Sequence, residues 1–313
     1  MSKPASRVRQ FEAFHAVVET SSVTRAAELL QISQPAVSAL VRALEADTGL
    51  QLFQRIRRRL VPTQEAHRLY AEVSRLLGAF AHVEHVANEI RSVGVGALRI
   101  AALPALGLRM IPEVLALLRR NHPGIDLALA IGTSQTVAEL VSFGHADIGF
   151  ILPVPGLGQL TVRTLARLPA VVVLPRNHRL AASTSLTPED LQGEQFISLG
   201  QEVPSQRLIN SLFDDQNVPR TLGVEMQYGA TICEMVACGA GVSIVDPVTA
   251  WAYADRVVTR RITPTVTFQI DVLTRTGQPT SAIVSSLLHD LRRRLRAIAS
   301  RGNGAEELTL SRH

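Results

Sequence analysis

The chain has 313 residues, which is enough for two or three domains with a large buried core. Hydrophobic residues make up 46% of it and the mean hydropathy is +0.17, so the composition excludes a disordered chain and favours a globular one. Lysine and arginine number 32 against 27 acidic residues, and the isoelectric point near 10.0 is compatible with a polyanionic partner.

The first residues lack the apolar core of a signal peptide, and no stretch approaches the about 18 apolar residues of a membrane span. We therefore expect a cytoplasmic protein with no membrane partner. Cys233 and Cys238 fit a reducing compartment, and their spacing on an expected helix points them to different faces. We expect them to pack and not to form a disulfide, and we expect no metal and no cofactor.

Two short helices joined by a tight turn are predicted over residues 21–44, after a first helix over residues 8–19. Thr24 is the expected N-cap of the first of the pair, and Ser33 that of the second, with Pro35 in its first turn. The apolar positions at which these two helices should touch are Ala27, Leu30, Ile32, Val37, Leu40 and Leu44.

The second helix of this pair leaves a small polar face, which carries no acidic residue before Glu45. This face consists of Gln34, Pro35, Ser38, Ala39 and Arg42. A helix with such a face can enter the major groove of DNA and bond base edges. The alternative is a helical hairpin with no such role.

A basic two-stranded ribbon is predicted after Gly49, anchored by Leu52 and Phe53 and ending at Pro62. Together with the helices it would form a winged helix-turn-helix. We expect the wing residues Arg55, Arg57 and Arg58, next to Arg59, to meet DNA phosphates or the adjacent minor groove. A solvated charge run is the alternative.

A long helix, capped by Thr63, is predicted to run to about Val93. Its apolar residues are spaced alternately by four and three, which is the period of a coiled-coil seam. We predict that two copies of the chain pair here, through Leu69, Val73, Leu76, Phe80 and Val83. The alternative is that the helix packs on its own C-terminal domain.

Strands and helices alternate from residue 97 onward, which is typical of a parallel sheet with helices on both faces. The expected strands are 98–103, 125–131, 147–152, 170–174, 196–199, 221–227, 242–245 and 266–272. The expected helices run to about 121, over 134–143, 205–216 and 230–238, briefly after Pro247, and over 281–299. We expect two α/β lobes, the first built from 97–165 and 266–300 and the second from 166–265.

A ligand of such a fold should bind between the lobes, at the carboxyl ends of strands and against helix N-termini. The candidate residues there are Ala105, Ser134, Gln135, Ser205, Thr231 and Asp246. Hydroxyl and backbone N–H groups suit a carboxylate, and Asp246 could bind an ammonium. For each of these residues an ordinary helix cap is the alternative.

The residues that carry a family resemblance lie at fixed spacings within the first 63 positions. They are Phe14, Ala16, Ser21, Ala26, Ala27, Leu30, Ser33, Gln34, Pro35, Ala36, Val37, Ser38, Leu44 and Glu45, then Leu52, Phe53, Arg55, Arg58 and Thr63 in the wing. Through this set the chain resembles the LysR-type transcriptional regulators, and the resemblance extends over nearly its whole length. It departs from them at Arg57, where a glycine is usual, and at Pro62, where a leucine is usual.

The resemblance implies a regulator of transcription, and not an enzyme, that forms a tetramer as a dimer of dimers and bends DNA beside RNA polymerase. It also implies a periplasmic-binding-protein-like effector domain, and it gives Gln34, Pro35, Ser38 and Arg42 the groove-facing role. We expect a DNA-binding domain over 1–66, a linker and dimerisation helix over 67–95, and an effector-binding domain over 96–313.

Residues 228–250 are similar to the subgroup that responds to opines and basic amino acids. We therefore expect the effector to be an amino acid or a derivative of one, with an aromatic or hydroxy-carboxylic acid as the alternative. A ligand-independent DNA-binding repressor is a further alternative, although a two-lobed domain is not needed to coat DNA. An enzyme is disfavoured because the chain has no nucleophile elbow and no phosphate-cradling loop.

Overall fold

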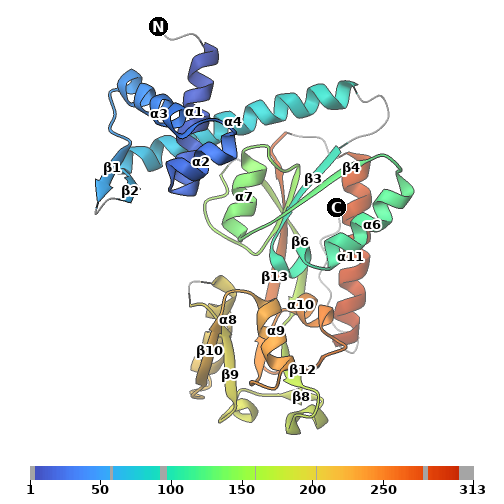
Figure 1. The fold of residues 1–313 in the computed structure, drawn as a ribbon. Helices are drawn as coiled ribbons and strands as arrows, with labels where there is room; N and C mark the ends of the chain where they lie inside the picture. Colours follow the sequence, from blue (N-terminus) through green and yellow to red (C-terminus); the bar gives the residue numbers. More distant parts are fainter. Residues whose placement is uncertain are drawn as a thin grey trace. The chain divides into compact units, whose positions relative to one another are not determined.

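The computed structural model describes residues 4–56, 59–91, 97–158, 160–201, 203–277 and 281–302 (Figure 1). The chain divides into two compact units, Met1–Ala87 and Asn88–His313, which are described separately below. The first unit contains α1 (Pro4–Thr20), α2 (Val23–Leu30), α3 (Gln34–Thr48), β1 (Phe53–Ile56), β2 (Arg59–Pro62) and α4 (Gln64–Arg91) as far as Ala87. The strands β1 and β2 pair in antiparallel fashion, as a wing does.

The caps of α2 and α3 explain where the paired helices begin. Ser33 caps α3 as predicted, since its hydroxyl accepts the N–H of Ala36 at 3.4 Å. The prediction that Thr24 caps α2 is wrong, because the helix begins earlier. Ser22 has the extended backbone of a cap, with φ of −154°, and its hydroxyl accepts the N–H of Arg25 at 3.3 Å.

The core of the first unit joins all of its helices to the wing. Its buried side chains include Phe14 on α1, Ala26 on α2 and Leu44 on α3, and Phe14 meets Phe53 of the wing edge-to-face at 5.8 Å. Ile32, which we predicted to lie between the two helices, is 40% exposed because the turn that carries it faces solvent.

The second unit begins with a lobe built on a five-stranded sheet of order β4-β3-β5-β13-β6. Its strands are β3 (Ala97–Ala102), β4 (Asp126–Ile131), β5 (Ile148–Ile151), β6 (Leu160–Pro169) and β13 (Thr267–Arg275). Its helices are α5 (Pro104–Gly107), α6 (Met110–Asn121), α7 (Ser134–Ser142) and α11 (Ala282–Gly302). The single helix predicted to run to about residue 121 is thus two helices, α5 and α6.

The sheet of this first lobe is mixed, so the prediction of a parallel sheet is wrong in part. The strands β3, β4 and β5 are parallel, but β13 is antiparallel to both of its neighbours, β5 and β6. The reason is the path of the chain: β6 leads away to the second lobe and β13 brings the chain back.

Helices cover both faces of this sheet. On one face α6 and α11 pack together over the main core, with Val114, Leu118 and Leu291 fully buried. On the other face α7 approaches β5 so closely that a side chain at Gly149 would collide with Val137 and Val141, at 2.8 and 2.7 Å. A glycine is therefore required where α7 crosses the sheet.

The second lobe contains a four-stranded sheet of order β11-β7-β12-β8 and the parallel pair β10-β9. Its strands are β7 (Val171–Pro175), β8 (Ser185–Leu186), β9 (Gln195–Leu199), β10 (Thr221–Met226), β11 (Ser243–Val245) and β12 (Val257–Ile262). Its helices are α8 (Pro204–Asp214), α9 (Gly229–Ala237) and α10 (Pro247–Ala252), with the 3-10 turns η1 (Arg179–Ala182) and η2 (Glu189–Leu191).

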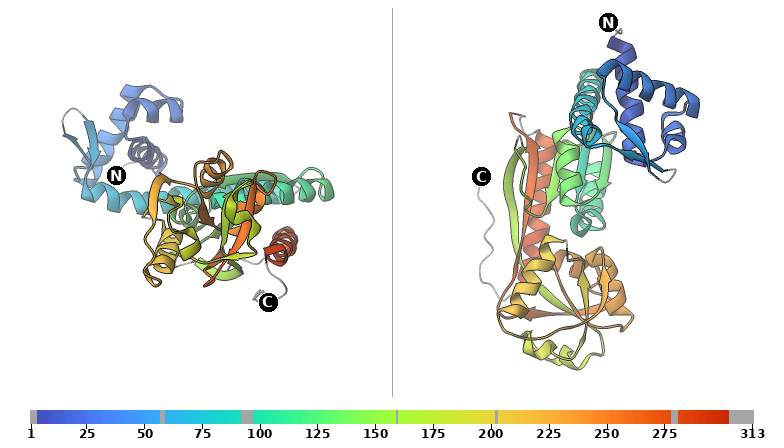
Figure 2. Two further views of the ribbon diagram at one scale, coloured as in Figure 1. Left: turned by 90° about the horizontal axis from the view of Figure 1, so that it is seen from below. Right: turned by 90° about the vertical axis from the view of Figure 1, so that its left-hand side faces the viewer.

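Alternate residues of β7 face opposite sides of the second lobe. Val171 and Val173 pack with α9, whereas Val172 and Leu174 pack with α8 and η1. In the right-hand view of Figure 2 the two lobes lie one above the other, and α11 lies beside the sheet of the first lobe.

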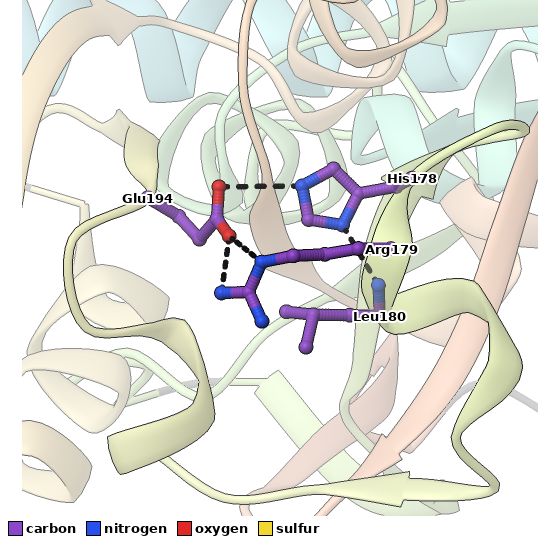
Figure 3. A network of polar contacts seen from close by, with 4 residues as sticks. All are labelled: His178, Arg179, Leu180 and Glu194. Atoms are coloured by element: carbon purple, nitrogen blue, oxygen red, sulfur yellow. Dashed lines mark hydrogen bonds and ion pairs between the residues drawn. The ribbon is translucent and has the colours of Figure 1, made fainter.

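A polar network of exposed Arg179 and partly buried His178 and Glu194 ties η1 to the turn before β9 (Figure 3). The Arg179 guanidinium donates two hydrogen bonds to Oε1 of Glu194, at 3.0 and 2.6 Å, and Nε2 of His178 lies 3.2 Å from Oε2. Because Nδ1 of His178 accepts the Leu180 N–H, the ring proton resides on Nε2 and is donated to Glu194.

Candidate functional site

The predicted recognition face of α3 is open to solvent. Gln34, Pro35 and Arg42 are exposed and Ser38 is partly exposed, while Val37, Val41 and Leu44 on the opposite face are buried. The Arg42 Nε donates to the carbonyl oxygen of Ser38 at 3.2 Å, which leaves most of the guanidinium available. The face is therefore a set of unobstructed donors and acceptors at the start of a helix.

Glu45 connects α3 to the wing, a role that the sequence reasoning missed. Its Oε1 accepts the backbone N–H groups of Leu52 and Phe53, at 2.8 and 3.1 Å. These bonds fix the first residues of the wing relative to the recognition helix, and they occupy the first acid that follows the polar face. The position of a glutamate seven residues before an apolar pair was the only sequence signal available.

The wing arginines are only partly described. Arg55 lies in β1, between Gln54 and Ile56, and its backbone pairs with Leu60. Arg57 and Arg58 lie outside the described residues. The contact of these three arginines with DNA remains a prediction.

The predicted seam on α4 divides into two parts. Leu69 and Val73 pack against the core of the first unit itself, where Val73 is fully buried. Leu76, Phe80 and Val83 are 39%, 50% and 65% exposed. Leu69 and Val73 thus pack within the chain itself. Leu76, Phe80 and Val83 are the seam residues that stay exposed and could contact a partner.

A cavity of about 460 Å³ lies between the two lobes of the second unit. Of the six candidates for effector binding, the five that line it are Ala105, Ser134, Gln135, Ser205 and Asp246. Thr231 does not line it, because its hydroxyl is turned back to the carbonyl oxygen of Tyr228 at 2.7 Å. Gln227 and Thr249, which the sequence reasoning did not single out, are part of the lining, and so is Tyr228, which begins the loop expected there.

The first lobe contributes the N-terminal turn of α7 to this cavity. Thr133 caps the helix by accepting the Thr136 N–H, and the Ser134 hydroxyl accepts the Leu152 N–H at 3.1 Å. The Ser134 hydroxyl hydrogen is thus free to be donated to a ligand. The Gln135 side chain donates one N–H to Glu139 at 3.1 Å, which leaves its carbonyl oxygen and its second N–H for a ligand.

The second lobe contributes Ser205, in the first turn of α8, and a rigid support behind it. Gln206 is fully buried; its Oε1 accepts the Leu199 N–H at 2.9 Å and its amide donates to Asn210 at 2.8 Å. Arg220 donates to the same Asn210 oxygen and lies over the Phe213 ring, 4.5 Å from its centroid. These contacts fix the first turn of α8, which carries Ser205.

Asp246 is the acidic residue in the described lining, which includes no lysine, arginine or histidine. Its two oxygens accept the N–H and the hydroxyl of Thr249, at 2.8 and 2.6 Å, so it also caps α10. Burial raises the pKa of this carboxyl above its usual value, although the bonds from Thr249 oppose the shift. A cation bound in the cavity would offset the free-energy cost of burying the Asp246 carboxylate.

The class that these two units define is a winged helix-turn-helix regulator with an attached domain for a small molecule. Residues 8–67 match the family described as bacterial regulatory helix-turn-helix protein, lysR family, and residues 92–296 match the LysR substrate binding domain. The chain therefore belongs to the LysR family. It is a DNA-binding transcriptional regulator with an effector-binding domain, and not an enzyme.

Relatives of known name support this assignment. The chain is 36% identical over 285 residues to the transcriptional activator protein LysR of Escherichia coli (strain K12), across 90% of this chain and 91% of that protein. It is 36% identical over 253 residues to the octopine catabolism/uptake operon regulatory protein OccR of Rhizobium meliloti, across 81% and 84%.

A solved structure confirms the fold. Full-length CbnR, in a complex with its target DNA, superposes with a TM-score of 0.64 at 22% identity, across 91% of this chain and 99% of that one. The predicted architecture, a winged helix-turn-helix followed by a long helix and a two-lobed domain, is thus confirmed. In the described part of this chain no helix is both long and apolar enough to cross a membrane.

Proposed function

We propose that the chain reads a two-fold operator through Gln34, Pro35, Ser38 and Arg42 of α3. The observation that supports this role is the exposed polar face itself, on a helix whose opposite face is buried and whose N-terminus is capped. Arg55, Arg57 and Arg58 of the wing then hold the DNA backbone. Phosphate contacts set the register, and the α3 side chains set the sequence preference.

The proposed effector is an amino acid or a derivative of one, bound in the cavity between the lobes. The observation that carries this proposal is the charge arrangement of the lining: hydrogen-bond donors such as Ser134 from the first lobe, and the Asp246 carboxylate from the second. Neutral donors suit a ligand carboxylate, and Asp246 suits an ammonium. The name of the relative OccR refers to octopine catabolism, which agrees with such a ligand.

The test compares each amino acid with the acid that is identical except that it lacks the amino group. Melting temperatures and calorimetric affinities are measured for amino acids, diamines and opines, and for the same acids without the amino group. In Asp246→Asn the amide oxygen still caps α10, so the fold is kept while the charge is lost. We expect that variant to lose at least tenfold in affinity for the amino acid and little for the deaminated acid. Equal losses for both ligands would refute the ammonium role.

An aromatic or hydroxy-carboxylic acid is the second candidate effector, and the apolar part of the cavity favours it. Leu168, Phe268 and Ile270 line the cavity on the side of the first-lobe strands, where a ring could pack. Binding of such acids, with none of amino acids, would select this candidate. A chain that no small molecule stabilises would instead fit a ligand-independent DNA-binding repressor.

We further propose pairing of two copies through Leu76, Phe80 and Val83 of α4, and assembly of these pairs into a tetramer that works beside RNA polymerase. The support is the exposure of three large apolar side chains at coiled-coil spacing. The corresponding domain limits are 1–66, 67–95 and 96–313. Sedimentation of the full-length chain tests the assembly, since a monomer at micromolar concentration would contradict it.

A further inference from the structure

A second hollow, of about 280 Å³, lies where α5, α9 and α10 meet. It shares Pro104, Ala105, Ala230 and Thr249 with the cavity between the lobes, so these residues border both spaces. Its own lining includes Leu108, Arg109 and Tyr253. An engineered cavity of about 150 Å³ holds benzene, so this hollow is large enough for a small organic molecule.

Arg109 gives this hollow a positive charge. Its Nε donates to Oε1 of Glu113 at 3.3 Å and its Nη1 donates to the carbonyl oxygen of Ala252, which together use two of the five guanidinium N–H groups. Arg294 donates to the other Glu113 oxygen at 2.5 Å, so two arginines share one carboxylate. The cluster of Arg109, Arg294 and Glu113 therefore has a net charge of one positive. Arg109 also keeps three N–H groups that can be donated to an anion.

Tyr253 adds a neutral donor to the lining of the hollow. Burial, with a further contribution from Glu234, raises the pKa of its phenol, so the hydroxyl stays protonated at neutral pH. Leu108 and Ala230 supply the apolar remainder of the lining. A cation, a hydroxyl donor and an apolar wall together match a carboxylate attached to a short hydrocarbon chain.

We propose that the hollow bounded by Leu108, Arg109, Ala230 and Tyr253 is a second binding site, which takes a small aliphatic monocarboxylate. Arg109 binds the carboxylate, and the hydrocarbon chain lies against Leu108 and Ala230. This site is separate from the cavity that holds Ser134, Gln135 and Asp246, and the proposal does not depend on the identity of the effector there.

The shared wall couples the two sites. Thr249 faces both spaces, and its hydroxyl donates to the Asp246 carboxylate at 2.6 Å. A carboxylate that moves Thr249 therefore changes the acceptor that a cation in the larger cavity would use. By linkage, each ligand changes the affinity for the other by the same factor. This last step rests on the proposed effector, whereas binding in the second hollow does not.

Trp251 provides a direct readout, because it is the single tryptophan of the chain and its ring centroid lies 4.9 Å from Cζ of Arg109. The full-length protein is titrated with sodium butyrate, with sodium chloride at matched ionic strength as the reference, while tryptophan emission is recorded. We expect a saturable emission change with a dissociation constant near or below about 10 mM. Arg109→Gln should weaken it at least tenfold, since the positive charge is lost.

Two variants serve as controls. Arg119→Gln removes an exposed arginine from the last turn of α6, outside the hollow, and should leave the titration unchanged. Ser134→Leu alters the larger cavity and should also leave it unchanged. A response absent in the wild type, retained in Arg109→Gln, or lost in Ser134→Leu would overturn the proposal. Because no effector is added, the result stands whether or not the amino-acid proposal survives.

Discussion

Replacing Glu45 with alanine tests the link between the recognition helix and the wing. The variant removes the acceptor of two backbone N–H groups, those of Leu52 and Phe53, which are both buried residues. A hydrogen bond to a charged acceptor contributes about 1.5–3 kcal/mol, and Glu45 is only partly buried, so the lower end applies to each bond. The loss for the pair is therefore about 3 kcal/mol. In Glu45→Gln the amide oxygen still accepts, and we expect a loss of about 1 kcal/mol.

Urea unfolding followed by circular dichroism, with hydrogen exchange over residues 50–56, measures these losses. Exchange of the Leu52 and Phe53 amides should accelerate in Glu45→Ala and much less in Glu45→Gln. Glu28→Ala removes an exposed acid from α2 and is the matched control. Unfolding of Glu45→Ala at the wild-type midpoint, with unchanged exchange, would refute the reasoning.

Binding of operator DNA by the same variants separates the structural role of Glu45 from the effect of its negative charge. Simple electrostatics predicts tighter binding whenever an acid beside DNA is removed, by either substitution. If Glu45 instead positions the wing, Glu45→Ala should bind DNA more weakly than wild type, whereas Glu45→Gln should bind at least as well. Tighter binding by Glu45→Ala would show that the wing does not depend on this carboxylate.

Other positions yield further predictions. Arg42→Ala should cost about 1–3 kcal/mol at the operator and relax the base preference there, as measured by binding to operator variants; an unchanged preference would remove Arg42 from base readout. Arg58→Ala should weaken all DNA sequences alike and reduce the salt slope of binding by about 1, so a constant slope would contradict a phosphate contact. Phe80→Asp should produce monomers in sedimentation, and a variant that sediments like wild type would refute the seam. Burial raises the pKa of Cys233 to about 12, so at pH 8 a thiol reagent should modify exposed Cys238 quickly and Cys233 only after unfolding; two fast equivalents would contradict the burial.

Local signals in the sequence were sufficient for most elements of the first unit. Proline at the start of α3, glycine at its end and the apolar spacing of α1 and α4 each have a direct structural consequence. They failed at Thr24, because Ser22 and Thr24 are equally good capping residues and only the packed helix decides between them. They also assigned Val73 to a seam between two copies, although Val73 is buried in the unit's own core.

Long-range pairing was the part that the sequence could not supply. The strand β6 alternates apolar residues with Arg163 and Arg167, and its place in the sheet depends on β13, about a hundred residues later. The lining of the larger cavity includes five of the six loop residues expected from the sequence, and their role in effector binding stays a prediction. That Thr249 and not Thr231 lines the cavity follows from the orientation of α9 relative to α10, which no local pattern encodes.

The position of β13 sets the order in which the second unit is completed during synthesis. This strand lies between β5 and β6, yet the whole second lobe is made before it. Until Thr267–Arg275 leave the ribosome, β6 has no partner in the first lobe, and one edge of β5 stays open. The second lobe can close on itself first, and the nascent first lobe exposes these unpaired edges until β13 is made.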